Sequence, residues 1–504
     1  MSETANAPGA TIAGLIEARA MEYPAAAALD DGNRQVTYAE LIRDSSALAG
    51  GLESLGITRG DRVAILSENS IEYTLLQLAC ARIGAIAACQ NWRLSAEEMQ
   101  HCIDLVQPAL FVWSARFADA ARMIETAYAA MPMADIPRSE TRPITAQADD
   151  PWLIIYTSGT TGLPKAAVIS QRTEIARMCT LRLDLALTKE DGFIAWAPMF
   201  HMGGTEHAMA TLMAGGCVFV VDGYDPARIA RILAGHPIGW LLLVPATIMP
   251  LVEELKASGT KPHSIKAVGC MADLCPEAEI GAAIDAFGAP FLNSFGSTET
   301  GLGPLSGDLV QSRSAISDLS KKLSFLYEVR IADASGAPCP AGTVGEAYVR
   351  GPCLFGGYWN APGANADAFA DGWYKMGDLF AMRDDGRFEY AGRSKYLIKS
   401  GGENIYPAEI ERVLLSDPRV EQAVVVRQPD PQWGEVPVAI LVAEAMSADE
   451  ARAMLEPRLA RYKLPRRYIF VSEKDLQLNV SGKADRTMLE ARLDLLDRAG
   501  SPDR

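Results

Sequence analysis

The stretch Thr157-Ser158-Gly159-Thr160-Thr161-Gly162-Leu163-Pro164-Lys165 says most about the fold and its chemistry. Its glycines let the backbone approach an anion closely, its hydroxyls donate to phosphate oxygens, and Lys165 adds a positive charge. It is not a Walker P-loop, because Pro164 stands where that motif needs its second glycine and Ala166 follows the lysine. A mobile surface turn is the alternative. Because an apolar run, Leu153–Tyr156, leads into it, we predict a phosphate-binding loop after a buried strand.

The composition is that of a globular protein with an acidic surface. The chain has 504 residues, of which 49% are hydrophobic and 22% charged, and its formal net charge is −16. A chain of this length can form more than one domain. An acidic surface repels phosphate backbones, so we expect no nucleic-acid partner.

Cysteine usage and hydropathy predict the compartment. The nine Cys are scattered, odd in number and never spaced C-x-x-C, which argues against disulfides and zinc sites. The first ten residues lack the features of a signal peptide. The longest apolar stretches, Ala208–Val221 and Ile238–Val252, are too short to cross a bilayer. We therefore expect a cytoplasmic protein without an integral membrane segment.

Alternating helix-like and strand-like patterns predict an α/β and α+β fold. We expect a large N-terminal domain of mixed sheets flanked by helices at residues 1–392. A small, mobile C-terminal α+β domain follows at 393–504. Four expected elements are helices at Ser67–Ile83 and Ala448–Arg461, a strand at Gly239–Val244 and an exposed connection at Met131–Asp150.

A second motif is Asn293-Ser294-Phe295-Gly296-Ser297-Thr298-Glu299. The Phe295 ring is suited to stacking on a purine, the Asn293 amide to pairing with an adenine edge, and the Glu299 carboxylate to Mg²⁺. A capped turn leading into a helix is the alternative. A third motif contains Asp378, which can accept hydrogen bonds from two ribose hydroxyls, and Arg393, which can reach the same sugar. Without the other motifs, the Gly-Asp pair at Asp378 would indicate only a surface turn.

These motifs resemble the adenylate-forming superfamily, which includes acyl-CoA synthetases, luciferases and peptide-synthetase adenylation domains. The resemblance covers roughly residues 10–490 and extends to Lys399–Glu411 and Asn479–Arg486. Gln477 and Leu478 depart from the family pattern, and so does Ser320–Phe325, where the family has Gly and Pro.

The resemblance implies a role for each matching residue. In the nucleotide site these are the phosphate loop (Thr157, Ser158, Gly159, Thr160, Thr161, Gly162, Lys165), the adenine site (Asn293, Phe295, Gly296), the ribose site (Asp378, Arg393) and the Mg²⁺ ligand (Glu299). The catalytic residues would be Lys483, His201, Thr298 and Glu299. Lys395 would be the hinge between the domains, and the coenzyme A tunnel would be lined by Ser400, Gly401 and Gly402. For His201 the alternative is a histidine buried in the core. For Lys483, taken without its sequence context, the alternative is a solvated surface lysine.

The resemblance implies an acyl pocket whose lining residues are mostly apolar or small. The pocket comprises Trp196, Met199, Met202, Gly203, Val244, Gly269, Met271, Ser294 and Leu302. These segments contain no Arg or Lys for a second carboxylate and no acidic residue for an ammonium group, and we expect Asp273 to lie outside the pocket. We therefore expect a monocarboxylic acid with an aryl or bulky aliphatic body, although plain core packing would explain the same residues.

The resulting hypothesis is an AMP-forming carboxylic acid–CoA ligase that uses ATP, Mg²⁺ and coenzyme A and forms an acyl-adenylate. One alternative is a stand-alone adenylation enzyme that loads a carrier protein. A luciferase-like oxygenase and a non-catalytic nucleotide-binding protein are more remote. The expected partners are small molecules, and a homodimer stays open.

Overall fold

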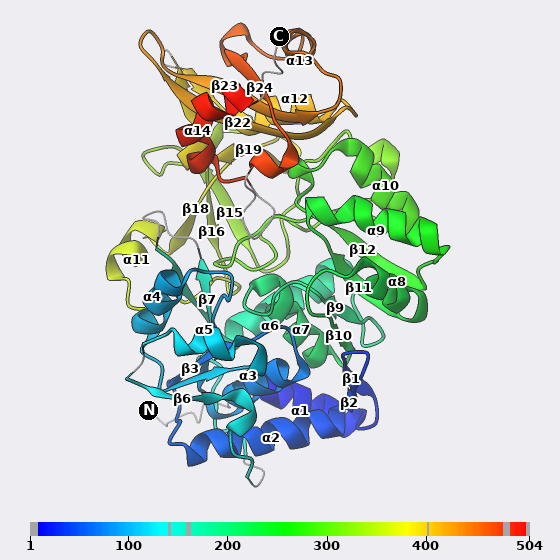
Figure 1. Cartoon of the computed structure of the whole chain (residues 1–504), viewed down its shortest axis with the longest axis vertical. Coiled ribbons are helices and arrows are strands. Elements are labelled where there is room, and N and C mark those ends of the chain that lie inside the picture. Colours follow the sequence, from blue (N-terminus) through cyan, green and yellow to red (C-terminus); the bar gives the residue numbers. More distant parts are fainter. Residues whose placement is uncertain are drawn as a thin grey trace.

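The computed structural model describes residues 9–125, 127–139, 143–157, 163–400, 403–476 and 484–499. The described strands form five sheets. Four lie in the large N-terminal part and the fifth in the C-terminal part, which occupies one end of the long axis (top of Figure 1).

The largest sheet has the strand order β6-β5-β3-β4-β7-β8 and is parallel except for the pair β7–β8. Helices cover parallel sheets on both faces, which explains the continuous apolar strands seen here. Its strands are β3 (Arg62–Leu66), β4 (Ile86–Cys89), β5 (Leu110–Trp113), β6 (Ala129–Pro132), β7 (Pro151–Thr157) and β8 (Lys165–Ser170).

Two four-stranded sheets follow, with orders β2-β1-β10-β9 and β11-β12-β13-β14. A single parallel bridge between Gly192 and Ile238 connects them. The strands of the first are β1 (Ala27–Asp30), β2 (Gln35–Thr37), β9 (Phe193–Ala195) and β10 (Val218–Val220). Those of the second are β11 (Pro237–Leu242), β12 (Ser264–Cys270), β13 (Phe291–Asn293) and β14 (Leu309–Val310).

An antiparallel sheet lies between these sheets and the C-terminal part. It contains β15 (Glu328–Ala332), β16 (Val344–Arg350), β17 (Phe369–Ala370), β18 (Trp373–Met382) and β19 (Phe388–Arg393). The last sheet contains β20 (Ile398–Ser400), β21 (Glu403–Ile405), β22 (Val420–Asp430), β23 (Gly434–Ala443) and β24 (Arg467–Phe470). The domain boundary proposed at 392/393 falls at the end of β19.

The helices flank these sheets. In the N-terminal part they are α1 (Ile12–Glu22), α2 (Tyr38–Ser54), α3 (Ile71–Ile83), α4 (Ala96–Val106), α5 (Ala118–Arg122), α6 (Gln171–Leu185), α7 (Met202–Ala214), α8 (Pro226–Gly235), α9 (Pro245–Ser258), α10 (Glu277–Phe287) and α11 (Pro362–Ala368). In the C-terminal part they are α12 (Pro407–Leu415), α13 (Ala448–Leu455) and α14 (Arg486–Ala499). None of the helices in the described part of the chain combines the length and apolar character needed to cross a bilayer.

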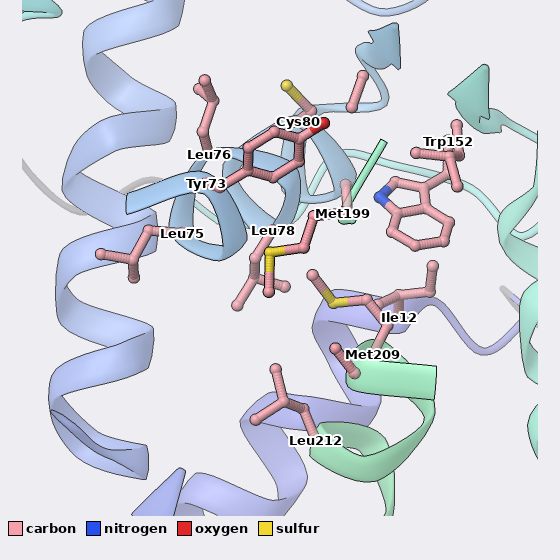
Figure 2. Packing of buried hydrophobic residues seen from close by; sticks show 14 of the residues in the cluster. Ile12, Tyr73, Leu75, Leu76, Leu78, Cys80, Trp152, Met199, Met209 and Leu212 are labelled. Carbon is pink, nitrogen blue, oxygen red and sulfur yellow. The ribbon is translucent and has the colours of Figure 1, made fainter. Parts of the chain in front are cut away.

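The main core lies where α1, α2, α3 and α7 pack together, and it includes residues of the largest sheet and of β9 and β10. Figure 2 shows Tyr73 and Leu78 of α3 facing Met199, while Met209 and Leu212 of α7 lie near Ile12 of α1. The indole of the fully buried Trp152 donates to the carbonyl of Gln77 at 3.3 Å, which ties β7 to α3. This core supports the strand that leads into the predicted phosphate loop.

Four expected elements differ from the structure at their ends. The helix expected from Ser67 begins at Ile71, because Ser70 caps it by accepting from the Tyr73 N–H. The helix expected to reach Arg461 ends at Leu455, two residues before Pro457, because proline disrupts a helix interior.

The other two differences concern strands. The strand expected at Gly239–Val244 is β11, which begins at Pro237 and ends at Leu242. The expected connection Met131–Asp150 starts inside β6, which pairs in parallel with β5 at the sheet edge. Its remaining described residues contain no further strand.

Candidate functional site

The predicted phosphate loop joins two antiparallel strands. Its first residue, Thr157, ends β7, and its last, Lys165, begins β8, and the two are register partners. Ser158, Gly159, Thr160, Thr161 and Gly162 lie outside the described residues. The Lys165 ammonium lies over the Tyr358 ring, 5.0 Å from its centroid. The end of the loop therefore contacts a side chain from a distant part of the chain.

Tyr358 connects this loop to the second motif. Its hydroxyl donates to Glu299 Oε1 at 2.8 Å, and burial raises the pKa of Tyr358 well above its usual value, with the nearby Glu299 charge adding to the effect. Thr298 and Glu299 are both buried, each 8% exposed. Lys165, Tyr358 and Glu299 thus form a continuous chain of contacts from the predicted phosphate loop to the predicted metal ligand.

The residues present fit Mg²⁺ at Glu299. The hydrogen bond from Tyr358 occupies Oε1, and no described residue is seen to donate to Oε2. Among the described residues, no cluster of three or more acidic, His or Cys side chains could hold a metal alone. Mg²⁺ bound to nucleotides commonly uses one or two carboxylates together with substrate phosphates and water. The Glu299 carboxylate, next to a loop predicted to hold the phosphates, would supply the protein ligand of such a site.

A buried arginine fixes the backbone of the Thr298–Glu299 pair. Arg177, from α6, donates through Nη2 to the carbonyls of Thr298 and Glu299, both at 3.1 Å. Its Nη1 pairs with Glu206 of α7 at 2.5 Å, and its Nε donates to the carbonyl of Cys353 at 2.9 Å. We call the Arg177–Glu206 pair with these carbonyl contacts the arginine brace.

Our sequence analysis did not identify the arginine brace. Arg177 and Glu206 are 7% and 3% exposed. The buried side of α7 is otherwise largely apolar, whereas that of α6 also carries Gln171, Thr173, Glu174 and Thr180. Glu206 is the only acidic residue in the apolar helix α7, which is the one sequence signal that could have drawn attention to it. A buried charge is nearly always paired, so an isolated acid on an apolar helix predicts a partner.

The predicted adenine site is built around Phe295. This ring is 4% exposed and lies edge-on to Phe380, with ring centroids 4.7 Å apart, and near Tyr390 at 5.8 Å. Gly296 follows in an exposed position. A Cβ atom on Gly296 would lie 2.0 Å from the carbonyl oxygen of Gly301, so the turn accepts only glycine there. The motif therefore brings an aromatic ring and an exposed backbone turn together.

The Asn293 amide has internal partners. Its oxygen accepts from the Ala272 N–H at 2.9 Å and from Lys321 Nζ at 2.6 Å, and its Nδ2 donates to the Leu319 carbonyl at 2.8 Å. Pairing of this amide with an adenine edge stays a proposal. The oxygen already accepts twice, whereas Nδ2 carries a second N–H that these contacts do not use.

The same contacts account for part of the unusual stretch Ser320–Phe325. Lys321 is fully buried, pairs with Asp273 at 2.6 Å and lies 5.9 Å from the Phe295 centroid. Burial lowers the pKa of Lys321, while Asp273 opposes that effect. The lysine thus joins the wall of the predicted adenine site to the segment after β12.

The predicted ribose residues are neighbours in one sheet. Asp378 on β18 and Arg393 on β19 are register partners, and Arg393 Nε lies 2.9 Å from Asp378 Oδ1. Asp378 is 1% exposed. The Asp378 charge raises the pKa of Arg393 against the opposing effect of burial. The structure therefore brings these two predicted residues together.

The predicted hinge follows directly. Lys395 lies in a 3-10 turn, Ser394–Tyr396, and its ammonium is 4.7 Å from the Tyr396 ring centroid. On the C-terminal side, Arg486 pairs with Glu411 at 2.9 Å and lies 5.1 Å from the same ring. Ser400 ends β20 and is buried. Gly401, Gly402 and Lys483 lie outside the described residues.

His201 caps α7. Its Nδ1 accepts from the Gly203 N–H at 3.1 Å, which leaves Nε2 as the protonated nitrogen of the neutral ring. The histidine is exposed rather than buried in the core. Its catalytic role stays a proposal.

Most predicted acyl-pocket residues follow the carboxyl ends of parallel strands, where open α/β sheets bind ligands. Trp196 and Met199 follow β9, Val244 follows β11, Met271 follows β12 and Ser294 follows β13. The other four lie on α7 (Met202, Gly203), within β12 (Gly269) and after the Thr298–Glu299 turn (Leu302).

Two of these side chains have packing partners in the interior. Met199 is 1% exposed and belongs to the main core, where the Thr74 hydroxyl approaches its sulfur at 3.7 Å. The Trp196 indole donates to the Leu242 carbonyl at 2.7 Å. A contact of either residue with a substrate remains a proposal.

Two family models match the chain, the AMP-binding enzyme model over residues 16–359 and the AMP-binding enzyme C-terminal domain model over 409–483. The chain therefore belongs to the AMP-binding enzyme family. This confirms the resemblance and, with the large N-terminal and small C-terminal parts, the predicted fold class.

Named relatives cover nearly the whole chain. A feruloyl-CoA synthase from Amycolatopsis sp is 32% identical over 472 residues, covering 92% of this chain and 95% of the relative. A 2-succinylbenzoate–CoA ligase from Bacillus cereus strain Q1 is 32% identical over 469 residues, again with 92% and 95% covered.

Solved structures agree in architecture. An o-succinylbenzoate CoA synthetase from Bacillus subtilis, in complex with its acyl-adenylate intermediate, has a TM-score of 0.83 and 29% identity, with 94% of this chain and 97% of that chain covered. The same synthetase has been solved with ATP and a magnesium ion, also with a TM-score of 0.83.

Proposed function

We propose that this enzyme is an AMP-forming carboxylic acid–CoA ligase, and that its substrate is an aryl or bulky aliphatic monocarboxylic acid. One observation supports this most strongly. The contacts from Lys165 through Tyr358 to Glu299 join the phosphate loop to the metal ligand, although these residues are far apart in sequence. The relatives are named for CoA thioesters of two aromatic acids, which favours an aryl substrate.

The proposed reaction has two steps. The substrate carboxylate attacks the α-phosphorus of ATP, a new C–O–P linkage forms, and the bond to the β-phosphate oxygen breaks as pyrophosphate leaves. The coenzyme A thiol then attacks the acyl carbon, the thiol proton is lost, and AMP leaves with the former carboxylate oxygen. No covalent bond to the protein is needed, so positioning and charge compensation carry the catalysis.

Each residue has a role in this proposal. Thr157, Lys165 and the loop between them hold the β- and γ-phosphates, and Thr298 contacts the α-phosphate. Glu299 holds Mg²⁺, which when bound offsets negative charge on the phosphates. Phe295 stacks on adenine, while Asp378 and Arg393 hold the ribose hydroxyls. Lys483 bridges the carboxylate and the α-phosphate.

The thioester step involves the C-terminal part. We propose that it pivots at Lys395, which removes Lys483 and brings Ser400, Gly401 and Gly402 to the coenzyme A tunnel. His201 would orient the carboxylate at the mouth of the acyl pocket.

The test is pyrophosphate release with ATP, Mg²⁺ and coenzyme A over a panel of acids. The panel contains acetate, fatty acids, benzoates, aryl-propionates, dicarboxylates and amino acids. We expect release confined to aryl or bulky apolar acids, with the CoA thioester detected by mass. Release without a thioester would indicate carrier-protein loading instead. If no acid in the panel causes pyrophosphate release while calorimetry shows that ATP still binds, the proposed activity on these acids is contradicted.

Replacing Phe295 with leucine is expected to raise the apparent KM for ATP by about 3- to 10-fold, because leucine fills similar space without a stacking face. Steady-state kinetics with varied ATP measure this. The matched control is Phe325→Leu at an exposed ring, which should leave the KM unchanged. An unchanged KM in Phe295→Leu would refute the stacking role.

We also propose that the enzyme acts in the cytoplasm. All nine cysteines are free thiols in the structure, which suits a reducing compartment. The proposed partners are the acid, ATP and coenzyme A, without nucleic acid. Light scattering at assay concentrations tests whether the enzyme forms a homodimer.

A further inference from the structure

A cavity lies between α6 and α7, next to the arginine brace. Its lining includes Glu174 and Arg177 of α6, His207 of α7, and Leu302 with Gly303. The cavity volume, measured as the space open to the centre of a water molecule, is about 30 Å³. A water molecule needs about 10–15 Å³ by this measure, so the cavity has room for about two waters or one small polar group.

Glu174 gives this cavity its chemistry. The residue is 1% exposed, and no described residue forms a hydrogen bond with either oxygen of its carboxyl group. Burial raises the pKa of Glu174 well above its usual value, the charge of Glu206 raises it further, and the charge of Arg177 opposes both effects. Buried carboxyl groups without a partner are rare, because leaving such a group unsatisfied is unfavourable. A ligand or water that fills the cavity would satisfy it.

The other polar groups in the lining are already engaged or neutral. The Arg177 guanidinium uses four of its five N–H groups, donating to Glu206 and to three backbone carbonyls, and its charge is already paired with that of Glu206. Burial, with the nearby His201 and Arg177 adding to the effect, lowers the pKa of His207 to about 3, so this ring is neutral. The cavity therefore offers the Glu174 carboxyl group, whose protonated form burial favours, and a cation that is already paired with Glu206.

The cavity adjoins the predicted acyl site. Leu302 belongs to both, and His207 lies one helix turn beyond Gly203 on the same face of α7. A substrate body that enters between Gly203 and Leu302 would therefore reach the cavity with the end that is remote from its carboxylate.

We propose that this cavity is the far end of the acyl pocket, and that Glu174 binds a hydroxyl group of the acid there. This inference rests on the proposed function and specifies its substrate class. A hydroxyl group occupies about the space of one water molecule and can both donate to and accept from a neutral carboxyl group. A second carboxylate would face Glu174, Asp184 and Glu206, and the cation in the lining, Arg177, is already paired with Glu206. An ammonium group would require Glu174 to ionise beside Glu206 in a buried site.

The experiment compares matched acids that differ only in this hydroxyl. Suitable pairs are 3-phenylpropionate with 3-(4-hydroxyphenyl)propionate, and cinnamate with 4-hydroxycinnamate. We expect kcat/KM of the wild-type enzyme to be about 10- to 100-fold higher for the hydroxylated member of a preferred pair. Glu174→Leu should bring this ratio close to 1. Glu174→Gln should retain much of it, because an amide can still hydrogen-bond the hydroxyl.

Glu190→Gln is the matched control, since Glu190 is an exposed carboxylate away from the cavity and should not affect the ratio. A ratio near 1 in the wild-type enzyme would overturn the proposal without any variant, as would an unchanged ratio in Glu174→Leu. A preference for acids with a terminal ammonium would also overturn it.

Failure of the proposed function gives a different result, namely no turnover of any acid. Calorimetric binding of the two acids of each pair would then test the subsite alone. Tighter binding of the hydroxylated acid to the wild-type protein but not to Glu174→Leu would support it, and equal binding would refute it.

Discussion

Replacing Lys483 with alanine is expected to slow pyrophosphate release from acid and ATP by about 10³-fold, because it removes the positive charge that offsets two anions as they meet. Thioester formation from a supplied acyl-adenylate should be nearly unaffected, since the proposed pivot at Lys395 removes Lys483 before that step. The two half-reactions are measured separately, by pyrophosphate release and by the consumption of synthetic acyl-adenylate with coenzyme A.

The matched control is Lys474→Ala, which removes an exposed lysine from the same C-terminal segment. It should leave both half-reactions at wild-type rates. Equal losses in the two half-reactions of Lys483→Ala would contradict a role confined to adenylation.

Replacing Arg177 with methionine is expected to lower both stability and activity. The change leaves Glu206 buried without its cation, which costs about 3–5 kcal/mol of unfolding free energy. It also releases the carbonyls of Thr298 and Glu299, and a displacement of about 1 Å at a reacting group can lower the rate by about 10²-fold. Urea unfolding and kcat/KM measure the two effects.

The double variant Arg177→Met with Glu206→Leu separates these effects. Replacement of a buried ion pair by apolar residues of similar volume is often neutral for stability, so the unfolding free energy should recover to near the wild-type value. Activity should remain low, because methionine cannot donate to the carbonyls of Thr298 and Glu299. Recovery of activity together with stability would show that the arginine brace acts only on folding.

The sequence was sufficient to predict the fold class, because short apolar runs mark the individual strands. The apolar run Arg62–Leu66 is β3, and Leu153–Tyr156 lies inside β7. Helix ends were less predictable. Periodicity alone does not show that the Ser70 side chain caps α3, although Pro457 does provide a signal that α13 ends early.

Motifs predicted parts of the site, and the structure adds how they are connected. Asp378 and Arg393 were predicted together as the ribose site, and the structure shows that they are cross-strand partners. Tyr358 and Lys321 were not predicted as site residues, because their contacts with Glu299 and Asn293 depend on tertiary packing. The same holds for the arginine brace, whose ionic and carbonyl partners are separated by long stretches of chain. Such pairings leave no periodic trace in one sequence.

The arginine brace has a consequence for biosynthesis. The guanidinium of Arg177 needs acceptors from α7, from the Thr298–Glu299 turn and from Cys353. A nascent chain that still lacks Cys353 cannot satisfy this group, so early docking of α6 onto α7 would bury an incompletely bonded charge. Contacts of such long sequence separation form late. We therefore expect the large domain to reach its native fold only after the segment that carries Cys353 has been synthesised.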